Sequence, residues 1–534
     1  MDLIQLSSIH PVATAAAALV MAGASTMLYY FVIEPATNSL NALPGPPSSH
    51  WFFGSMKEII NAKWEEGNYP EPFLSWYANV PRLTLMMSFR VKKYGGAVHF
   101  RAVMTHRVML SDPEALKHVH VVNNDNYPRA MEIRNILRVV LGGDGLLSTE
   151  GETHHHMRKM LTPHNGFAKV REFVDIFAHH ARQLSNHLKQ VADQGVAVDM
   201  HEFFTKMTLD VIGVCAFGYN FGSLENGNDR VLDAYKVTSQ PPELFNEVAS
   251  MYIPGFDKWP LPHLAKKREA KRILLEKVDN VIASKLQAPR DVNRPTDLVD
   301  LILEVEAGQQ RVTPEEARCH VMTFMFAGHE TTSTTLSWVL AMLATHPEME
   351  NIARKECQAV AATSEGGVIG SKSLSELEYT TAFIQETLRV FPTAVHTATR
   401  ECISDDHVPM SDGKPIFIPK GTTIYISLVA LHHNPKYWSQ PDEFIPERFL
   451  EGSAVYEADK GLRNGHGNTF TYMPFSAGPK NCIGMRFAMA ELQVVISNLL
   501  LQFSFRLTDK ANISPQLTTT LRPVDLNMTI HSVA

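Results

Sequence analysis

The 534-residue sequence lacks the patterns that would signal disulfides, structural zinc or a bound nucleotide. Its five cysteines are an odd number, widely scattered and without a Cys-x-x-Cys pair, which fits neither a disulfide framework nor a zinc site. It has no nucleotide-binding glycine fingerprint. The net charge of −7 is modest and gives no sign of nucleic-acid binding. We therefore expect most of the chain to face a reducing compartment.

Charge is also missing near the N-terminus, where residues 11–33 include no Asp, Glu, Lys or Arg. A helix of this stretch would be about 35 Å long, enough to cross a hydrocarbon core of about 30 Å. Tyr29, Tyr30 and Phe31 end it, as aromatic residues do at a membrane interface. A cleaved signal peptide is the alternative, but its apolar region is normally about 7–15 residues behind a basic start. The first basic residue here is Lys57, so the distribution of charge does not define the orientation of this helix in the membrane.

Behind this predicted anchor the pattern is mainly helical with a small β region. The proline-rich residues 43–47 cannot continue a helix. Residues 97–103 and 107–110 predict two strands around a turn at Thr105-His106, and Asp112-Pro113 predicts a helix start. Helical patterns then dominate to about residue 395, and residues 415–428 predict more strand.

One predicted helix is unusually long. A capping box from Thr313 to Glu316, with Pro314 inside it, opens the helix, and no breaker follows before Thr345. Such a helix would be about 48 Å long, more than an ordinary surface helix needs. Its middle is apolar, so we expect it to cross the centre of the domain.

The most informative segment is PFSAGPKNCIG, residues 474–484. Cys482 stands between two glycines and before an apolar helix. Gly478 would let the backbone turn close to a flat ligand, and Gly484 would let main-chain amides approach the sulfur. The positive end of the helix would lower the thiol pKa and favour the thiolate, the form that ligates iron. The segment therefore predicts a haem site; the alternative is a buried structural cysteine.

Phe475, Gly478, Cys482 and Gly484 resemble the haem-binding signature of the cytochromes P-450, Phe-x-x-Gly-x-Arg-x-Cys-x-Gly. Lys480 stands where arginine is usual, and would meet a haem propionate without a bidentate fork. The resemblance implies the cytochrome P-450 fold, with a long central helix over haem b (iron protoporphyrin IX) and Cys482 as the axial iron ligand. By this resemblance the chain has two parts. Residues 1–40 are an N-terminal membrane anchor and linker, and residues 41–534 are a haem-thiolate catalytic domain.

The long helix carries a second resemblance. Ala327 and Gly328 stand about one turn before Thr331, where small residues would leave room for a flat cofactor and dioxygen. Glu330 and Thr331 resemble the acid–alcohol pair of oxygen-activating cytochromes P-450, so we expect them to deliver protons. Alternatively, this Gly/Thr pattern marks only a packing notch or a kink.

A structural network is also implied. Glu386 and Arg389 lie one helical turn apart, as in the family's Glu-x-x-Arg motif, and Arg448 lies in a segment that matches its third member. By this resemblance the three residues are structural and lock the loop that presents Cys482. An exposed, weakly stabilising ion pair is the alternative for Glu386 and Arg389.

Further candidates for the haem propionates are Arg400 and Arg158. Arg158 ends a stretch that resembles the family's Trp-x-x-x-Arg motif, with His154 at the tryptophan position; a histidine N–H can still donate to a carboxylate. The run His154-His155-His156 is not expected to bind a metal ion, because consecutive helical side chains point about 100° apart.

These features predict a membrane-anchored monooxygenase that inserts one oxygen atom from O2 into a lipophilic substrate. Electrons would come from a separate NADPH-cytochrome P-450 reductase, docked on a basic patch of Lys159, Lys480 and Arg486. The resemblance implies a single-pass protein of the endoplasmic reticulum with its catalytic domain facing the cytosol. Two alternatives remain: a haem-thiolate isomerase or dehydratase acting on peroxides, and a non-catalytic haem-binding membrane protein. Substrate contacts are expected from the centre of the long helix and from residues 123–144, 241–262, 393–397 and 514–520.

Overall fold

The structure is a computed structural model that describes residues 11–533 except 47, 49, 56–94, 104, 226–229, 239, 241–245, 247–248, 251–252, 254, 288–295 and 304–311. It is mainly helical with small sheets, as the sequence predicts. Lys57, the first basic residue of the sequence, lies outside the described residues.

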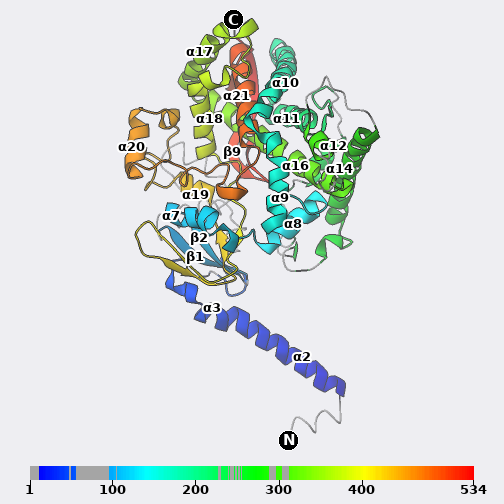
Figure 1. Ribbon diagram of the computed structural model, residues 1–534, viewed down its shortest axis with the longest axis vertical. Helices are drawn as coiled ribbons and strands as arrows, with labels where there is room; N and C mark the ends of the chain where they lie inside the picture. Colours follow the sequence, from blue (N-terminus) through cyan, green and yellow to red (C-terminus); the bar gives the residue numbers. More distant parts are fainter. Residues whose placement is uncertain are drawn as a thin grey trace.

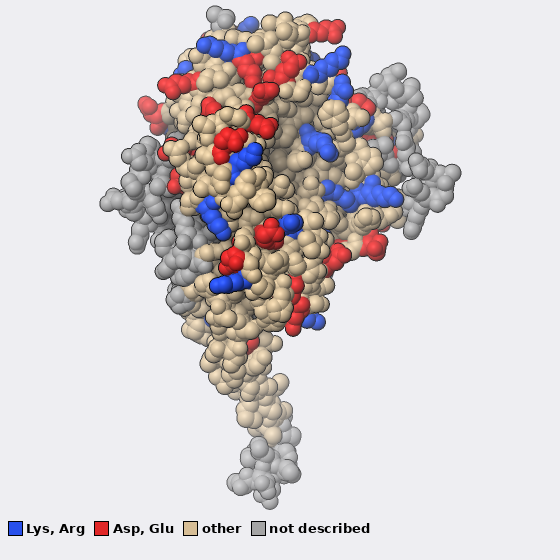
Figure 2. Space-filling view, turned by 60° about the vertical axis from the view of Figure 1, so that its left-hand side comes forward, with Lys and Arg blue, Asp and Glu red and all other residues tan. Residues whose placement is uncertain are grey.

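The N-terminal segment is a helical rod that leaves the body of the protein (Figure 1). It consists of α2 (Pro11–Leu28), the π-helical η1 (Tyr29–Ile33) and α3 (Glu34–Thr37). The rod is long and apolar enough to cross a membrane, and its most apolar window is not buried against the rest of the chain. Figure 2 shows most of it as a tan stalk below a body that carries both signs of charge. The predicted helix over 11–33 is therefore confirmed, and it continues to Thr37.

The main sheet lies at the end of the body from which this rod departs (Figure 1). Its order is β1 (Ala97–Ala102), β2 (Thr105–Leu110), β7 (Thr423–Tyr425) and β4 (Arg400–Glu401), with β2 and β7 parallel and the other pairs antiparallel. β1 and β2 confirm the two predicted strands, but the predicted turn position is wrong, because Thr105 and His106 lie within β2 and pair with Ala102 and Arg101. At the predicted helix start, the Asp112 side chain accepts from the Glu114 and Ala115 amides and caps α7 (Pro113–Lys117).

Three smaller sheets complete the β structure. β5 (Asp406–Val408) pairs with β6 (Ile416–Ile418), and β9 (Asn512–Leu517) pairs with β10 (Leu521–Asp525). The third sheet has the order β3 (Val198–Asp199), β11 (Asn527–Ser532) and β8 (Phe503–Leu507). β6 and β7 lie within the stretch 415–428, where strand was predicted.

The long helix is α16 (Pro314–Thr345), which passes through the middle of the body (Figure 1). Its capping box is formed, and most of its second half is buried, so the predicted length, start and central position are confirmed. The other helices of eight or more residues in the described part of the body are α8 (Met131–Leu141), α9 (Gly151–Leu161), α10 (Phe167–Gln194), α11 (Met200–Phe217), α12 (Arg230–Thr238), α14 (Pro262–Gln287), α17 (Pro347–Thr363), α18 (Glu378–Val390), α20 (Ala454–Leu462) and α21 (Met485–Gln502).

The largest hydrophobic core joins α10, α11, α16 and α21. Phe177 and Phe487 meet edge to face with ring centroids 4.8 Å apart, and Trp338 stacks on Phe391 at 3.9 Å. The first pair joins α10 to α21 and the second joins α16 to the residue after α18, and burying large rings in this way stabilises the fold. The core therefore sets the position of the two helices that carry the candidate site.

Candidate functional site

Cys482 lies in the loop between the short η11 (Gly478–Lys480) and α21. Its amide donates to the carbonyl of Phe475 at 2.8 Å, which closes the loop. Cys482 has an accessible thiol, whereas the other four cysteines are buried. Protein atoms nevertheless lie close enough to this thiol for burial to affect its ionisation.

The electrostatics of Cys482 differ from the expectation. Burial raises the pKa of its thiol, and the Gly484 amide, which bonds the sulfur, and the Arg158 charge act in the opposite direction. The Gly484 amide at the start of α21 thus lowers the pKa as predicted, but burial outweighs it and the net direction is upward. A metal ion at the sulfur would supply the missing positive charge and keep a coordinating thiol deprotonated.

The backbone geometry at position 478 requires a glycine. Its φ is +73°, and a Cβ built on it would lie 2.0 Å from the carbonyl oxygen of His120 in η4 (His118–Val122). Only glycine fits both conditions. The close approach predicted for this glycine is thus present, but the neighbour is the chain itself.

The middle of α16 presents small groups on one face. Ala327 is exposed within this otherwise well-buried helix, and the Thr331 hydroxyl donates to the Ala327 carbonyl at 2.7 Å. Gly328 serves another purpose than predicted, because a Cβ there would approach the Ile212 side chain of α11 to 2.8 Å. Ala327 and Thr331 therefore share an open face, while Gly328 allows two helices to pack closely.

Glu330 is held by two hydroxyl groups. Tyr235 of α12 donates to its Oε2 at 2.5 Å, and Thr520, before β10, donates to its Oε1 at 3.1 Å. Thr520 also shares a hydrogen bond with Thr334, 3.0 Å away and one turn further along α16. Tyr235 packs edge to face on His329 with centroids 4.0 Å apart. The carboxylate is thus fixed by hydroxyl groups from two segments that lie far from α16 in the sequence.

Several buried nitrogen atoms near the cysteine loop have no hydrogen-bond partner in the part of the chain that the structure describes. They are Nε2 of His154, Nε2 of His120 and Nε of Arg400. Burial lowers the pKa of His154 to about 4, of His120 to about 3 and of Arg400 to about 10. The Arg400 guanidinium also donates to Asn124 Oδ1 at 3.1 Å and to the Tyr127 carbonyl at 2.9 Å. A bound carboxylate would satisfy these orphaned donors.

Lys480 and Arg158 are engaged within the protein. Lys480 pairs with Glu150, which also accepts from Arg129 at 3.0 Å. Arg158 donates to the carbonyl oxygen of Asn481 at 2.5 Å and to its Oδ1 at 2.6 Å, beside Cys482. The prediction that Lys480 belongs to an exposed docking patch is wrong, because its side chain is 6% exposed and ion-paired.

Glu386, Arg389 and Arg448 form one fully buried network, so they are not the exposed pair considered as the alternative. Arg389 forks onto Glu386 with two bonds of 2.7 Å, and Arg448 donates to Glu386 at 3.2 Å. Arg448 also reaches Asp459 at 2.5 Å. Burial is compensated here by bidentate pairing and further hydrogen bonds, as a buried charge requires.

This network is connected to the cysteine loop through His432 in α19 (Leu428–His432). Arg389 donates to the His432 carbonyl at 2.9 Å, and the amide of Met473 donates to His432 Nε2, also at 2.9 Å. Met473 begins the loop that ends at Cys482. The polar core is therefore joined to the segment that presents the thiol.

The sequence analysis missed Tyr235, Glu150 and Asn481, and it named Thr520 only within a substrate segment and not as a partner of Glu330. Of these, Asn481 had a signal in the sequence, since it directly precedes Cys482. His155 and His156 are exposed while His154 is buried, as the 100° rule predicts. No group of three or more possible metal ligands occurs among the described residues.

The sequence model of the cytochrome P450 family matches residues 44–529. The chain belongs to the cytochrome P450 family. It is 30% identical to cytochrome P450 4A24 of Sus scrofa over 484 residues, which cover 87% of this chain and 86% of the relative. It is 29% identical to leukotriene-B4 omega-hydroxylase 3 of Mus musculus, with 92% and 91% covered, and 29% identical to cytochrome P450 monooxygenase 205 of Postia placenta, with 89% and 88% covered.

This membership makes the protein a haem-containing cytochrome P450 monooxygenase with an N-terminal helix that fits membrane anchoring. The residues present fit the haem. An accessible thiol at the start of α21 suits the iron, and the orphaned donors of His154 and Arg400 suit the carboxylates of its propionates.

Proposed function

We propose that this cytochrome P450 holds haem b through Cys482 and inserts one oxygen atom from O2 into a lipophilic substrate. The observation that carries the proposal is the thiol of Cys482, accessible, bonded by the Gly484 amide and placed at the start of α21. We assign residues 1–40 to the anchor and linker and residues 41–534 to the catalytic domain.

His154 and Arg400 would hold the propionates, because their free N–H groups are buried and close to the cysteine loop. Lys480 and Arg158 would contribute positive potential while bonded to Glu150 and Asn481. When bound, the haem supplies the activation of dioxygen. The protein then has to exclude water, orient the substrate and provide protons.

Glu330 and Thr331 are the proton-delivering residues in this proposal. Tyr235 and Thr520 fix the Glu330 carboxylate, so a proton moves between defined oxygen atoms rather than from a mobile side chain. The Thr331 hydroxyl lies on the open face beside Ala327 and can exchange its bond to the Ala327 carbonyl for one to water. Glu386, Arg389 and Arg448 have the structural task of fixing the cysteine loop.

For the substrate we propose an apolar chain hydroxylated near its end. This is supported by the likeness to a leukotriene-B4 omega-hydroxylase and by the apolar anchor that would bring the protein to a lipid phase. Residues 123–144, 393–397 and 514–520 remain the proposed substrate segments. Much of 241–262 lies outside the described residues, but Trp259 within it is 43% exposed.

For electrons we propose a separate NADPH-cytochrome P450 reductase, with the protein in the endoplasmic reticulum and its catalytic domain in the cytosol. The exposed Lys159 and Arg486 remain candidates for the docking surface near the cysteine loop. Turnover supported by the reductase should fall as salt rises, since salt screens exposed charges beyond about 10 Å. A turnover rate that is flat in salt would contradict this docking surface.

The decisive experiment is the reduced carbon monoxide difference spectrum of the full chain, wild type against Cys482→Ala. The wild type should show the thiolate-ligated absorption and the variant should lose it. Lipophilic candidates are then tested with reductase and NADPH. Turnover of a fatty-acid hydroperoxide without reductase would instead identify an isomerase or dehydratase, and a spectral shift on ligand binding without any turnover would identify a carrier.

A further inference from the structure

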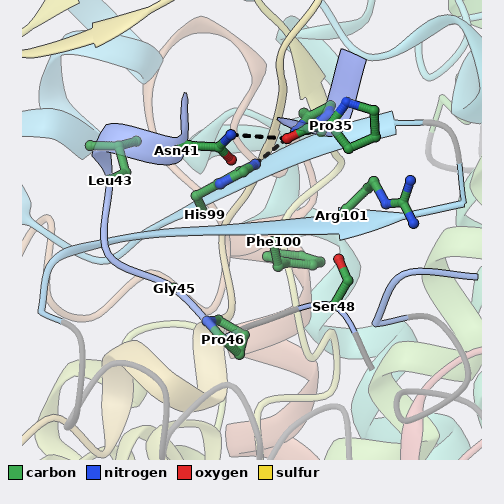
Figure 3. A pocket seen from close by; sticks show the side chains of 10 residues that line it. Pro35, Asn41, Leu43, Gly45, Pro46, Ser48, His99, Phe100 and Arg101 are labelled. Atoms are coloured by element: carbon green, nitrogen blue, oxygen red, sulfur yellow. Dashed lines mark hydrogen bonds between the residues drawn. The ribbon is translucent and has the colours of Figure 1, made fainter. Parts of the chain in front are cut away.

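A cavity of about 320 Å³ lies where the anchor joins the catalytic domain, away from the cysteine loop. Pro35, Asn41 and Leu43 line it from the chain that leaves the anchor, and His99 and Arg101 line it from β1 (Figure 3). The walls are mainly polar, and a cavity of this size holds a small ligand group. None of these residues has a task in the proposed oxygen chemistry.

Arg101 is the unusual member of this cavity. It is only 5% exposed, and its Nη2 donates to the backbone carbonyls of His50, at 3.3 Å, and Trp51. Its Nε and Nη1 have no hydrogen-bond partner in the described ranges. Leaving donors of a buried charged group unsatisfied costs about 1–3 kcal/mol or more, so these two nitrogens call for an acceptor.

The charges around the cavity define that acceptor. His99, His106 and Glu34 form a relay with two bonds of 2.8 Å, and Asn38 donates to the other Glu34 oxygen at 2.7 Å. Glu34 influences the Arg101 charge, but its oxygens are engaged in these bonds. Burial lowers the pKa of His99 to about 4, so His99 is neutral at pH 7. Arg101 is thus a buried cation whose Nε and Nη1 have no acceptor among the described residues, which suits a monoanion.

The location defines the source of the anion. The cavity begins directly after the apolar rod, and Trp51, beside Arg101, is 61% exposed. Phe31 at the end of the rod stacks on Phe52 at 4.8 Å and meets Trp51 edge to face at 5.6 Å. Aromatic side chains of this kind gather at the headgroup level of a bilayer. A phosphodiester is the anion that is abundant at this depth.

We propose that the cavity bounded by Arg101, His99 and Asn41 binds the phosphodiester of one phospholipid headgroup. Arg101 donates Nε or Nη1 to a phosphate oxygen in a charge-assisted hydrogen bond; these two nitrogens lie on different edges of the guanidinium, so the contact is not a bidentate fork. The site fixes the catalytic domain against the membrane at the base of its anchor. This proposal depends on membrane anchoring and not on any step of the monooxygenase reaction.

The test uses the full chain in a non-ionic detergent and follows its thermal unfolding. The probes are dihexanoylphosphatidylcholine below its micelle concentration, dihexanoylglycerol, which lacks the phosphate, and inorganic phosphate. We expect a saturable rise in Tm with the phosphatidylcholine alone. Arg101→Gln should weaken this binding by about tenfold or more. The matched control is Arg107→Gln, on the neighbouring strand and outside the cavity, which should bind as the wild type does.

Three outcomes would overturn the proposal: an equal response to dihexanoylglycerol, an unchanged response of Arg101→Gln, or no response of the wild type. An equal response to inorganic phosphate would replace the lipid by a free anion. If Arg101→Gln does not fold, Asn41→Ala and Ser48→Ala remove other lining groups and should each weaken binding several-fold. These readouts need no turnover, so they stay informative even if the proposed oxygen chemistry fails.

Discussion

Tyr235 Oη donates to Glu330 Oε2 across 2.5 Å, although the two residues are 95 positions apart. The bond joins α12 to the open middle of α16 and leaves the other carboxylate oxygen to Thr520. A charged hydrogen bond of this kind is worth about 1.5–3 kcal/mol. Tyr235 is therefore a positioning residue for the proposed proton donor.

Tyr235→Phe keeps the ring that packs on His329 and removes only the hydroxyl. We expect kcat to fall by about tenfold, because Glu330 loses its fixed orientation. The fraction of NADPH oxidised without product should rise, while the substrate-induced spectral shift should keep its Kd. The matched control is Thr238→Val on the same helix, whose hydroxyl bonds only the Tyr235 carbonyl. An equal loss in both variants would assign Tyr235 a merely structural role.

The buried Glu386 network makes a prediction about stability. Glu386→Gln removes the buried carboxylate that faces Arg389 and Arg448, so Arg389 loses its bidentate charged partner while Arg448 keeps Asp459. We expect the free energy of unfolding to fall by about 3–5 kcal/mol, with a lower haem content after purification. Denaturant unfolding and the haem-to-protein ratio measure these effects. Glu269→Gln, which breaks an exposed pair with Arg272, is the control and should change neither quantity.

The parts of this protein that were predictable from sequence are those encoded locally. The capping box at Thr313 and the unbroken run behind it predict α16 to the residue, and a charge-free stretch predicts the anchor. The Cys482 loop was found because its residues lie within one short segment. Each of these signals needs only the spacing along the chain.

What sequence did not predict depends on contacts between distant segments. Thr520 and Glu330 are 190 positions apart, and nothing in either segment indicates their bond. Lys480 was expected at the surface because lysine side chains are usually exposed, but its ion pair with Glu150 stabilises it in a buried position. The direction of the Cys482 pKa shift also depends on tertiary burial, which a helix N-terminus alone does not report.

Buried histidines predict a steep loss of stability in acid. Nine have a pKa lowered to about 3 or 4, chiefly by burial: His99, His120, His154, His164, His180, His201, His320, His329 and His432. Below the unfolded-state value of about 6.5, the unfolded chain binds protons that the native chain does not. Each group therefore removes stability as the pH falls, up to about 2 kcal/mol by pH 5.

We expect Tm to be nearly constant above pH 7 and to drop sharply between about pH 6.5 and pH 5. His180→Gln, in α10, should reduce this drop because it removes one group that is protonated only on unfolding. Ser185→Ala on the same helix removes a buried hydroxyl without a titrating group and should lower Tm equally at both ends of the range. A wild-type Tm that is flat from pH 7.5 to pH 5 would contradict the prediction.

The loop that presents Cys482 offers a test of its own geometry. Gly478→Ala combines a positive φ of +73° with a Cβ that would stand 2.0 Å from the His120 carbonyl oxygen. Neither atom belongs to a flexible side chain, so η11 and η4 have to separate. We expect a loss of stability well above the roughly 1 kcal/mol that a positive φ alone costs alanine. The displaced loop should also lose haem.

Gly452→Ala separates these two causes. Gly452 has a φ of +85°, but a Cβ there would meet nothing within 4 Å, so this variant has the backbone strain without the collision. We expect it to bind haem normally and to lose about 1 kcal/mol of stability. Haem content and denaturant unfolding, measured side by side, compare the two alanine variants. If both variants lose equal stability and both retain haem, then contact between Gly478 and His120 does not set the position of the Cys482 loop.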